Sequence, residues 1–214
     1  MRKELKCKKG VALIELVAGL PLAVLILLVV TMAVLNFIKS YQETKLYTQA
    51  QDELFDAIET MRYGFTKQGV TDDESLIGVL TTKELTISAN RKSMTLKPIN
   101  LNPGFEYWSR FFLDDVGYLR VSGQYGLTGY NSQLVFPADD LRLTNGQQHF
   151  RITQLEFVPL KTNNNRVYLL GVNIEVQIRF REKGKDQNAE EDSRTNLKNI
   201  EYNTMIFVGN ASSE

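Results

Sequence analysis

An uncharged run of twenty residues extends from Leu16 to Leu35, close to the start of the chain. As an α-helix with a rise of about 1.5 Å per residue, such a run is about 30 Å long, which is the thickness of the hydrocarbon core of a bilayer. A helix that is apolar on all sides has to be covered by lipid or by other protein. The run therefore predicts a membrane-spanning helix.

Charge is distributed unevenly around this run. Residues 1–10 contain five of the chain's 25 basic residues and one of its 25 acidic residues, whereas Lys39 and Lys45 after the run are offset by Glu43. The positive-inside rule then predicts that residues 1–10 lie in the cytoplasm and that the body of the protein lies outside it. The body carries twenty basic and twenty-four acidic residues, which argues against nucleic-acid binding through charge.

Two simpler interpretations of the apolar run are a cleaved secretory signal peptide and an uncleaved signal anchor. The apolar part of a signal peptide is about 7–15 residues long and is followed by a small-residue cleavage site. This run is longer, and Thr31-Met32-Ala33 is the nearest approximation to such a site. A lipoprotein signal is excluded because Cys7, the only cysteine, precedes the run. The signal anchor stays open as an alternative.

Glu15 is a carboxylate at the beginning of the apolar segment, and neither simpler interpretation explains it. Burying it in lipid costs about 1–3 kcal/mol, depending on depth, so a partner is expected. The surrounding residues are a basic pair, a glycine, four apolar residues and a glutamate, in the order Lys8-Lys9-Gly10-Val11-Ala12-Leu13-Ile14-Glu15. This segment resembles the cleavage and methylation motif of type IV prepilins.

In that family, prepilin peptidase cleaves after the glycine, the new amino terminus is N-methylated, and the fifth mature residue is glutamate. The resemblance implies cleavage between Gly10 and Val11, N-methylation of Val11, and an assembly role for Glu15. A cationic amine at Val11 can pair with Glu15 of a neighbouring subunit, which lowers the cost of both charges in the lipid layer. The chain departs from the family at Val11, where phenylalanine or methionine is usual, and at Ala12, where threonine or serine is common.

The helix is predicted to continue beyond the membrane. Large apolar residues recur mostly at intervals of three, four or seven, which is helical periodicity; they are Phe37, Tyr41, Tyr47, Leu54, Ile58, Met61 and Phe65. We expect one helix from Val11 to about Phe65, with a bend or a melted turn near Gly19 and Pro21. Gly64 and Gly69 are expected to end it, followed by an exposed loop at 71–75.

After residue 75 the apolar period changes to two, which indicates antiparallel strands. Residues 85–87 and 94–96 flank Asn90-Arg91-Lys92 as a hairpin. Further strands are predicted at 141–143, which leads into the Asn145-Gly146 turn, at 150–160, at 167–180 and at 202–208. A turn is expected at 162–165 and a polar mobile connection at 182–196. In the strand at 167–180, one face is expected to hold Val172, Ile174, Val176, Ile178 and Phe180. The predicted fold class is α+β, in which a long N-terminal helix packs on a mostly antiparallel β head.

The end of the chain carries a second, more general resemblance. A long strand, a polar loop and a last strand that ends in Val208-Gly209-Asn210 resemble the carboxyl end of J-type minor pseudopilins of type II secretion and their counterparts in type IV pilus and competence systems. This similarity covers about sixty residues by lengths and periods alone.

Sequence motifs of catalysis are absent. The chain has one histidine, His149, and one cysteine, so a Cys/His zinc site or a disulfide framework cannot be built. It also lacks a G-x-S-x-G motif and a P-loop. We therefore expect no enzyme, no cofactor and no small-molecule substrate, and we interpret His149 as a surface residue.

Two acidic pairs and one aromatic cluster each have two interpretations. Asp114-Asp115 and Asp139-Asp140 offer oxygen ligands to calcium but lack the spacing of a known calcium loop, so solvated turns are favoured. The aromatic cluster is either an exposed interaction surface or core, and core is favoured because a small β head needs large apolar residues inside. Its members are Tyr107, Trp108, Phe111 and Phe112.

These observations predict four regions: a prepilin leader at 1–10, a transmembrane and assembly helix at 11–36, the amphipathic half of the helix at 37–69, and an extracytoplasmic β head at 70–214. The leading hypothesis is a minor pilin or pseudopilin of a pilus, a type II secretion pseudopilus or a DNA-uptake filament. Its expected partners are prepilin peptidase, other pilins and inner-membrane lipid. The alternatives are a membrane-anchored adhesin or cargo-binding head, and a membrane-anchored enzyme of unfamiliar type.

Overall fold

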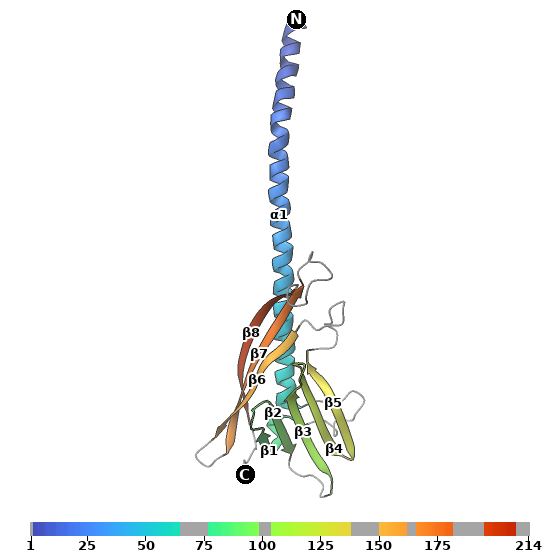
Figure 1. The fold of residues 1–214 in the computed structure, drawn as a ribbon, viewed down its shortest axis with the longest axis vertical. Coiled ribbons are helices and arrows are strands. Elements are labelled where there is room, and N and C mark those ends of the chain that lie inside the picture. The colour runs from blue at the N-terminus through green and yellow to red at the C-terminus, as the bar shows by residue number, and fades with distance from the viewer. Residues whose placement is uncertain are drawn as a thin grey trace. The chain divides into compact units, whose positions relative to one another are not determined.

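The fold is described by a computed structural model for residues 2–64, 77–98, 104–137, 150–161, 166–181 and 195–208 (Figure 1). Within the first helix, side chains are described from Val17 onward, Ala18 excepted. The chain divides into two compact units, Met1–Leu46 and Tyr47–Glu214. The first contains most of helix α1, and the second contains the rest of α1 and all the strands. The α+β class with a long apolar N-terminal helix and antiparallel strands is therefore confirmed.

Helix α1 runs from Arg2 to Tyr63, a span of 62 residues. It begins nine residues before the predicted start at Val11, so the basic segment is helical as well. The melted turn expected near Pro21 is wrong, because α1 continues through this residue; a single proline removes one hydrogen bond while its neighbours keep theirs. The predicted end is confirmed: Gly64 has a φ of 96° and donates its N–H to the Thr60 carbonyl at 2.9 Å.

The buried stripe of α1 is shorter than predicted. Leu54, Ile58 and Met61 are buried as expected, together with two alanines that the apolar pattern missed, Ala50 and Ala57. Phe37 and Tyr41 are instead 71% and 63% exposed. The stripe that packs in the head therefore lies between Ala50 and Met61, and the prediction that Phe37 and Tyr41 belong to it is wrong. Phe65 and Gly69 lie outside the described residues.

The first sheet is a five-stranded antiparallel meander. After the short helix η2 (Val79–Thr81), its strands are β1 (Thr82–Ile87), β2 (Ser93–Pro98), β3 (Glu106–Leu113), β4 (Leu119–Gly126) and β5 (Thr128–Phe136), which are neighbours in chain order. The predicted hairpin is confirmed, since Leu85 pairs with Leu96 and Ile87 with Met94. Arg91 in its turn has a φ of 57°, in the left-handed region that residues other than glycine adopt uncommonly.

The second sheet contains β6 (Phe150–Lys161), β7 (Val167–Arg181) and β8 (Thr195–Phe207), again antiparallel neighbours. On β7 the predicted alternation is confirmed, because Val172, Ile174, Val176 and Ile178 are all buried. Strand β8 begins seven residues before the predicted start at Tyr202, so residues 195 and 196 belong to it and not to the polar connection. Residues 182–194, 162–165 and 138–149 lie outside the described residues, and so do the predictions made for them.

Both sheets and α1 contribute to one core in the second unit. The rings of Phe136 on β5 and Phe150 on β6 are stacked with centroids 6.1 Å apart, which joins the two sheets. Of the aromatic cluster only Phe111 is fully buried; the other three are half-buried, so the prediction that all four are core residues is wrong. Trp108 and Phe112 fall on the opposite face of β3 from Phe111 because successive side chains alternate.

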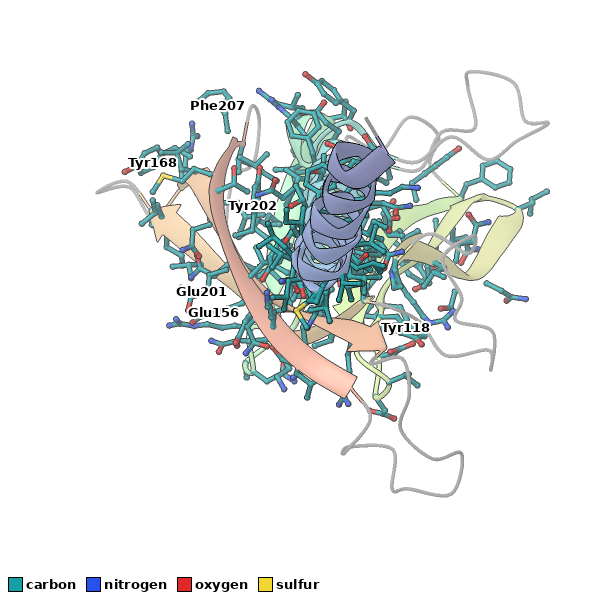
Figure 2. All side chains as sticks on the ribbon, turned by 90° about the horizontal axis from the view of Figure 1, so that it is seen from above. Tyr118, Glu156, Tyr168, Glu201, Tyr202 and Phe207 are labelled. Atoms are coloured by element: carbon teal, nitrogen blue, oxygen red, sulfur yellow. The ribbon has the colours of Figure 1, made fainter. Side chains whose placement is uncertain are left out.

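Side chains of β8 divide between its two faces. Tyr202 lies on the side of the strand that faces α1, and Glu201 lies on the other side (Figure 2). On the same side as Tyr202, Nζ of Lys198 lies 5.8 Å from the ring centroid of Tyr47. These contacts place the end of α1 from Tyr47 onward within the same compact unit as the strands.

Candidate functional site

The residues of the predicted processing and assembly site lie together in α1. Gly10, Val11 and Glu15 belong to about its first four turns, and their side chains lie outside the described residues. A protease has to unwind a helix locally before it can cleave it. Glycine weakens a helix interior by about 1 kcal/mol relative to alanine, so Gly10 is the position in this stretch where unwinding costs least.

The apolar surface that follows is uncovered. Thirteen large apolar side chains between Val17 and Leu35 are each 47–68% exposed. The described part of α1 contains an 18-residue window with a mean hydropathy of 2.6 and no buried residue, which is long and apolar enough to cross a membrane. At about 1 kcal/mol or more for each half-exposed side chain, covering this surface contributes on the order of 10 kcal/mol. It therefore requires lipid or another protein.

The one hydroxyl inside this stretch is satisfied by the helix itself. Thr31 donates its Oγ1 hydrogen to the Leu27 carbonyl at 2.7 Å, one turn earlier. A hydroxyl bonded in this way does not need water. The segment from Leu16 to Leu35 thus presents no unsatisfied side-chain donor among its described residues.

No protein-family model, no curated protein and no solved structure matches this chain. The N-terminal segment is a helix that is long and apolar enough to span a membrane, with Glu15 at the beginning of its apolar run.

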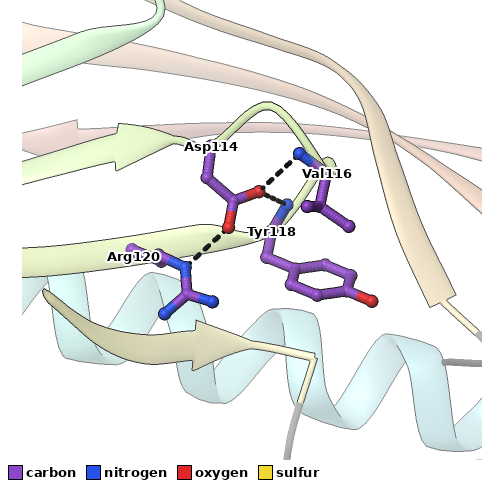
Figure 3. A network of polar contacts seen from close by, with 4 residues as sticks. All are labelled: Asp114, Val116, Tyr118 and Arg120. Carbon is purple, nitrogen blue, oxygen red and sulfur yellow. Dashed lines mark hydrogen bonds and ion pairs between the residues drawn. The ribbon is translucent and has the colours of Figure 1, made fainter. Parts of the chain in front are cut away.

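The acidic residue Asp114 forms a turn between β3 and β4 (Figure 3). Its Oδ1 accepts hydrogen bonds from the backbone N–H of Val116 at 3.0 Å and of Tyr118 at 2.8 Å, and its Oδ2 accepts one from Nε of Arg120 at 2.6 Å. The carboxylate is thus occupied as the cap of a tight turn. The described residues contain no group of three or more metal-ligating side chains. Asp139, Asp140 and His149 lie outside them.

Electrostatics at this turn favour the ionised carboxylate. Partial burial raises the pKa of Asp114, but the hydrogen bond and charge of Arg120, together with the N–H groups of Tyr118 and Val116, outweigh it and hold the pKa below its ordinary value. Because the folded pKa is lowered, the ionised carboxylate stabilises the fold at neutral pH, and this stabilisation is lost as the pH falls through the lowered value.

Replacing Asp114 with asparagine is expected to lower the free energy of unfolding by about 1–3 kcal/mol at pH 7, because Arg120 loses its charged partner. The difference from the parent should shrink as the pH falls through the lowered pKa of Asp114. Both the loss at pH 7 and its change with pH can be measured by urea unfolding of the full chain in nanodiscs, followed by the fluorescence of the single tryptophan, Trp108. Asp115→Asn, on the exposed neighbour, is the control, and an equal loss there would contradict the role assigned to Asp114.

A second polar contact joins the two sheets. Arg91 in the β1–β2 turn forms an ion pair of 2.8 Å with Glu156 on β6, and its carbonyl accepts the N–H of Phe157 at 2.9 Å. The hydrogen bond from Arg91 holds the pKa of Glu156 below its ordinary value, with a further contribution from Asn173. Sequence reasoning identified Arg91 as a turn residue but gave no signal for its partner, which lies 65 positions away.

Proposed function

We propose that this protein is a minor pilin or pseudopilin, a structural subunit that is processed by prepilin peptidase and assembled through its N-terminal helix into a filament. The observation that carries the proposal is the Lys8-Lys9-Gly10 element with Glu15 five residues after the glycine. It stands at the start of a helix whose apolar side chains from Val17 to Leu35 are uncovered. The β head supplies the part of the subunit outside the membrane.

In this proposal, the apolar surface of α1 is covered both before assembly, in the membrane, and after assembly, in the filament. Before assembly, lipid covers the apolar side chains of α1, with residues 1–10 in the cytoplasm and the head periplasmic or extracellular. In the filament, helices of neighbouring subunits replace the lipid, so the apolar area stays out of water throughout. Cleavage after Gly10 creates a cation at Val11, and Glu15 of a neighbour neutralises it. A filament of a pilus, a type II secretion system or a DNA-uptake system fits this arrangement equally well.

Processing provides the direct test. Intact-mass measurement of protein from cells with an active prepilin peptidase is expected to show the loss of residues 1–10, with Cys7, and a chain that starts at Val11. Gly10→Val should leave a full-length protein that is still inserted in the membrane, because a branched side chain at the cleaved bond blocks the close approach to the backbone that glycine allows.

Gly19→Val is the matched control, because Gly19 lies in the same helix and a Cβ there meets no atom within 4 Å. This variant should be processed as the parent is. A full-length parent protein, or one that starts at Val34 after a signal-peptidase cut, would overturn the proposal and favour an anchor or a secreted protein.

A further inference from the structure

A polar cleft opens where the turns of the first sheet meet β6. It has a volume of about 470 Å³, which is within the usual range of about 300–1,000 Å³ for ligand sites. Its walls come from the β1–β2 turn, from β3 and the turn after it, and from β6, and its polar lining includes Asn90, Ser93 and Thr153. All of these residues belong to the second compact unit.

Three cationic side chains from three separate elements line this cleft: Lys92 from the β1–β2 turn, Arg110 from β3 and Arg151 from β6. Among the described residues, none of the three has a carboxylate within 4.0 Å. Four other described cations, Arg62, Arg91, Lys97 and Arg120, are each paired with an acid. The cleft therefore gathers positive charge that the described chain does not neutralise.

Local backbone geometry positions these cations. Gly117, with a φ of 95°, lies so close to Arg151 that a Cβ would stand 2.7 Å from Cγ of this arginine. The Gly117 carbonyl also accepts the N–H of Ile152 at 2.8 Å. Thr153 is the residue at which the register of β6 against β7 shifts. The Gly117 turn thus positions Arg151, and the β-bulge positions Thr153, two residues further along β6, at the cleft.

Arg110 is held by two contacts that leave its charge available. Its guanidinium carbon lies 5.6 Å from the ring centroid of Phe112, and its Nη2 lies 3.5 Å from the Ser93 hydroxyl. Stacking on a ring orients the planar guanidinium without neutralising it. The hydrogen-bonding edges of Arg110 that these contacts leave unused are suited to a carboxylate.

The acids near the cleft do not cancel its charge. Asp114 is occupied by Arg120 and two backbone N–H groups, and exposed Asp115 is the remaining carboxylate among the described residues of the lining. In the part of the lining that the structure describes, three unpaired cations against one acid give a positive charge, although residues 11–214 carry four more acidic than basic residues. A short anion is attracted locally, whereas a long polyanion such as nucleic acid meets the repulsion of the acidic body.

We propose that this cleft binds an acidic peptide segment of a partner protein, with side-chain carboxylates on Arg110, Arg151 and Lys92. Two guanidinium groups match carboxylates in shape and charge. Asn90, Ser93 and Thr153 offer donors and acceptors to the amide groups of the peptide. The inference rests on residues of the head alone and does not depend on the pilin proposal.

The test uses the full chain in phosphatidylcholine nanodiscs and fluorescein-labelled hexaglutamate, with binding followed by fluorescence anisotropy at low and at high salt. The triple variant Lys92→Gln, Arg110→Gln, Arg151→Gln is expected to bind about tenfold more weakly or worse. The matched control Lys83→Gln, Lys161→Gln, Arg166→Gln removes the same charge from three exposed positions outside the cleft. It should bind within about twofold of the parent.

Three results would overturn the proposal: no saturable binding of hexaglutamate by the parent, equal weakening in both triple variants, or a cleft-dependent affinity for polyphosphate without one for hexaglutamate. Trp108 fluorescence verifies that each variant is folded. Should the triple variant unfold, Lys92→Glu replaces it, because Lys92 is an exposed turn residue. This reversal of charge should weaken hexaglutamate binding by about threefold or more, and unchanged binding would also count against the cleft.

Discussion

Leucine in place of Glu15 is expected to prevent entry into filaments while membrane insertion and leader cleavage continue. The substitution removes a carboxylate from an otherwise apolar segment, so insertion alone becomes easier. In a filament, however, the amine of Val11 in a neighbouring subunit is left buried without a partner. An uncompensated buried charge costs about 3–5 kcal/mol, which lowers incorporation by about a hundredfold or more.

Site-specific crosslinking between neighbouring helices, with leader removal followed on the same gel, measures both outcomes for this variant. Glu15→Gln removes the charge and keeps the shape, so it should fail in the same way. Thr31→Leu is the control, because it removes a polar group whose hydroxyl already bonds within its own helix. Equal crosslinking of the parent and Glu15→Leu would mean that Glu15 has no intermolecular partner, and the signal-anchor alternative would then be favoured.

The period of apolar residues in the sequence was sufficient to predict those strands in which apolar and polar residues alternate strictly. On β7 the buried set Val172, Ile174, Val176 and Ile178 is the predicted one, because a strand with one buried face has its register specified by that face. The hairpin around Arg91 was predictable for the same reason, with turn residues between two apolar runs. Strict alternation and a turn between two apolar runs are local patterns, so they predict structure without knowledge of distant contacts.

The period of apolar residues did not predict burial or strand position correctly where these depend on the neighbouring element that packs on the segment or pairs with it. Phe37 and Tyr41 continue the helical pattern but are exposed, whereas Ala50 and Ala57, which have small side chains, are buried. The start of β8 was missed because the outward-facing residues Asn199 and Glu201, with Lys198 just before them, resemble a polar loop in the sequence. Their strand is specified by pairing with β7, where Gln177 lies opposite Asn199 and Glu175 opposite Glu201.

Of the two candidate sites, one can be identified from the sequence and the other only from the structure. Gly10, Val11 and Glu15 form a contiguous motif, so the sequence alone identifies them. The cleft combines Lys92, Arg110 and Arg151, whose positions in the chain are up to 59 residues apart. Only the pairing of strands and the Gly117 turn bring them together, and no spacing in the sequence signals this.

Gly78 is a further residue that sequence reasoning passed over, and alanine there is expected to destabilise the head strongly. Its φ of −96° and ψ of 173° suit any residue, so the requirement for glycine is one of space. An added Cβ would lie within 3.0 Å of backbone atoms of Arg62, Tyr63 and Gly64 at the end of α1. Backbone cannot rotate aside as a side chain does, so either the helix end or the 77–81 segment has to move.

That movement would disturb buried neighbours on both sides of Gly78. Ile77 donates its N–H to the buried Ser109 hydroxyl at 2.8 Å, and Val79 is fully buried. We expect Gly78→Ala to lower the free energy of unfolding by about 3 kcal/mol or more, a large part of the about 5–15 kcal/mol that stabilises a typical domain. The corresponding fall in melting temperature is about 6–12 °C for a chain of this size.

Two other glycines make the test a graded series. At Gly171 the added Cβ meets Val158 at 3.4 Å, and at Gly129 it meets nothing within 4 Å. The loss of stability, measured by thermal unfolding of the full chain in nanodiscs with Trp108 fluorescence, should therefore be negligible for Gly129→Ala, small for Gly171→Ala and large for Gly78→Ala. Because all three variants add the same methyl group, differences in helix or strand propensity of about 1 kcal/mol cannot account for a loss as large as that expected for Gly78→Ala. If Gly78→Ala were as stable as Gly129→Ala, segment 77–81 would not pack against the end of α1. The close contacts of Gly78 with the backbone of residues 62–64 would then be contradicted.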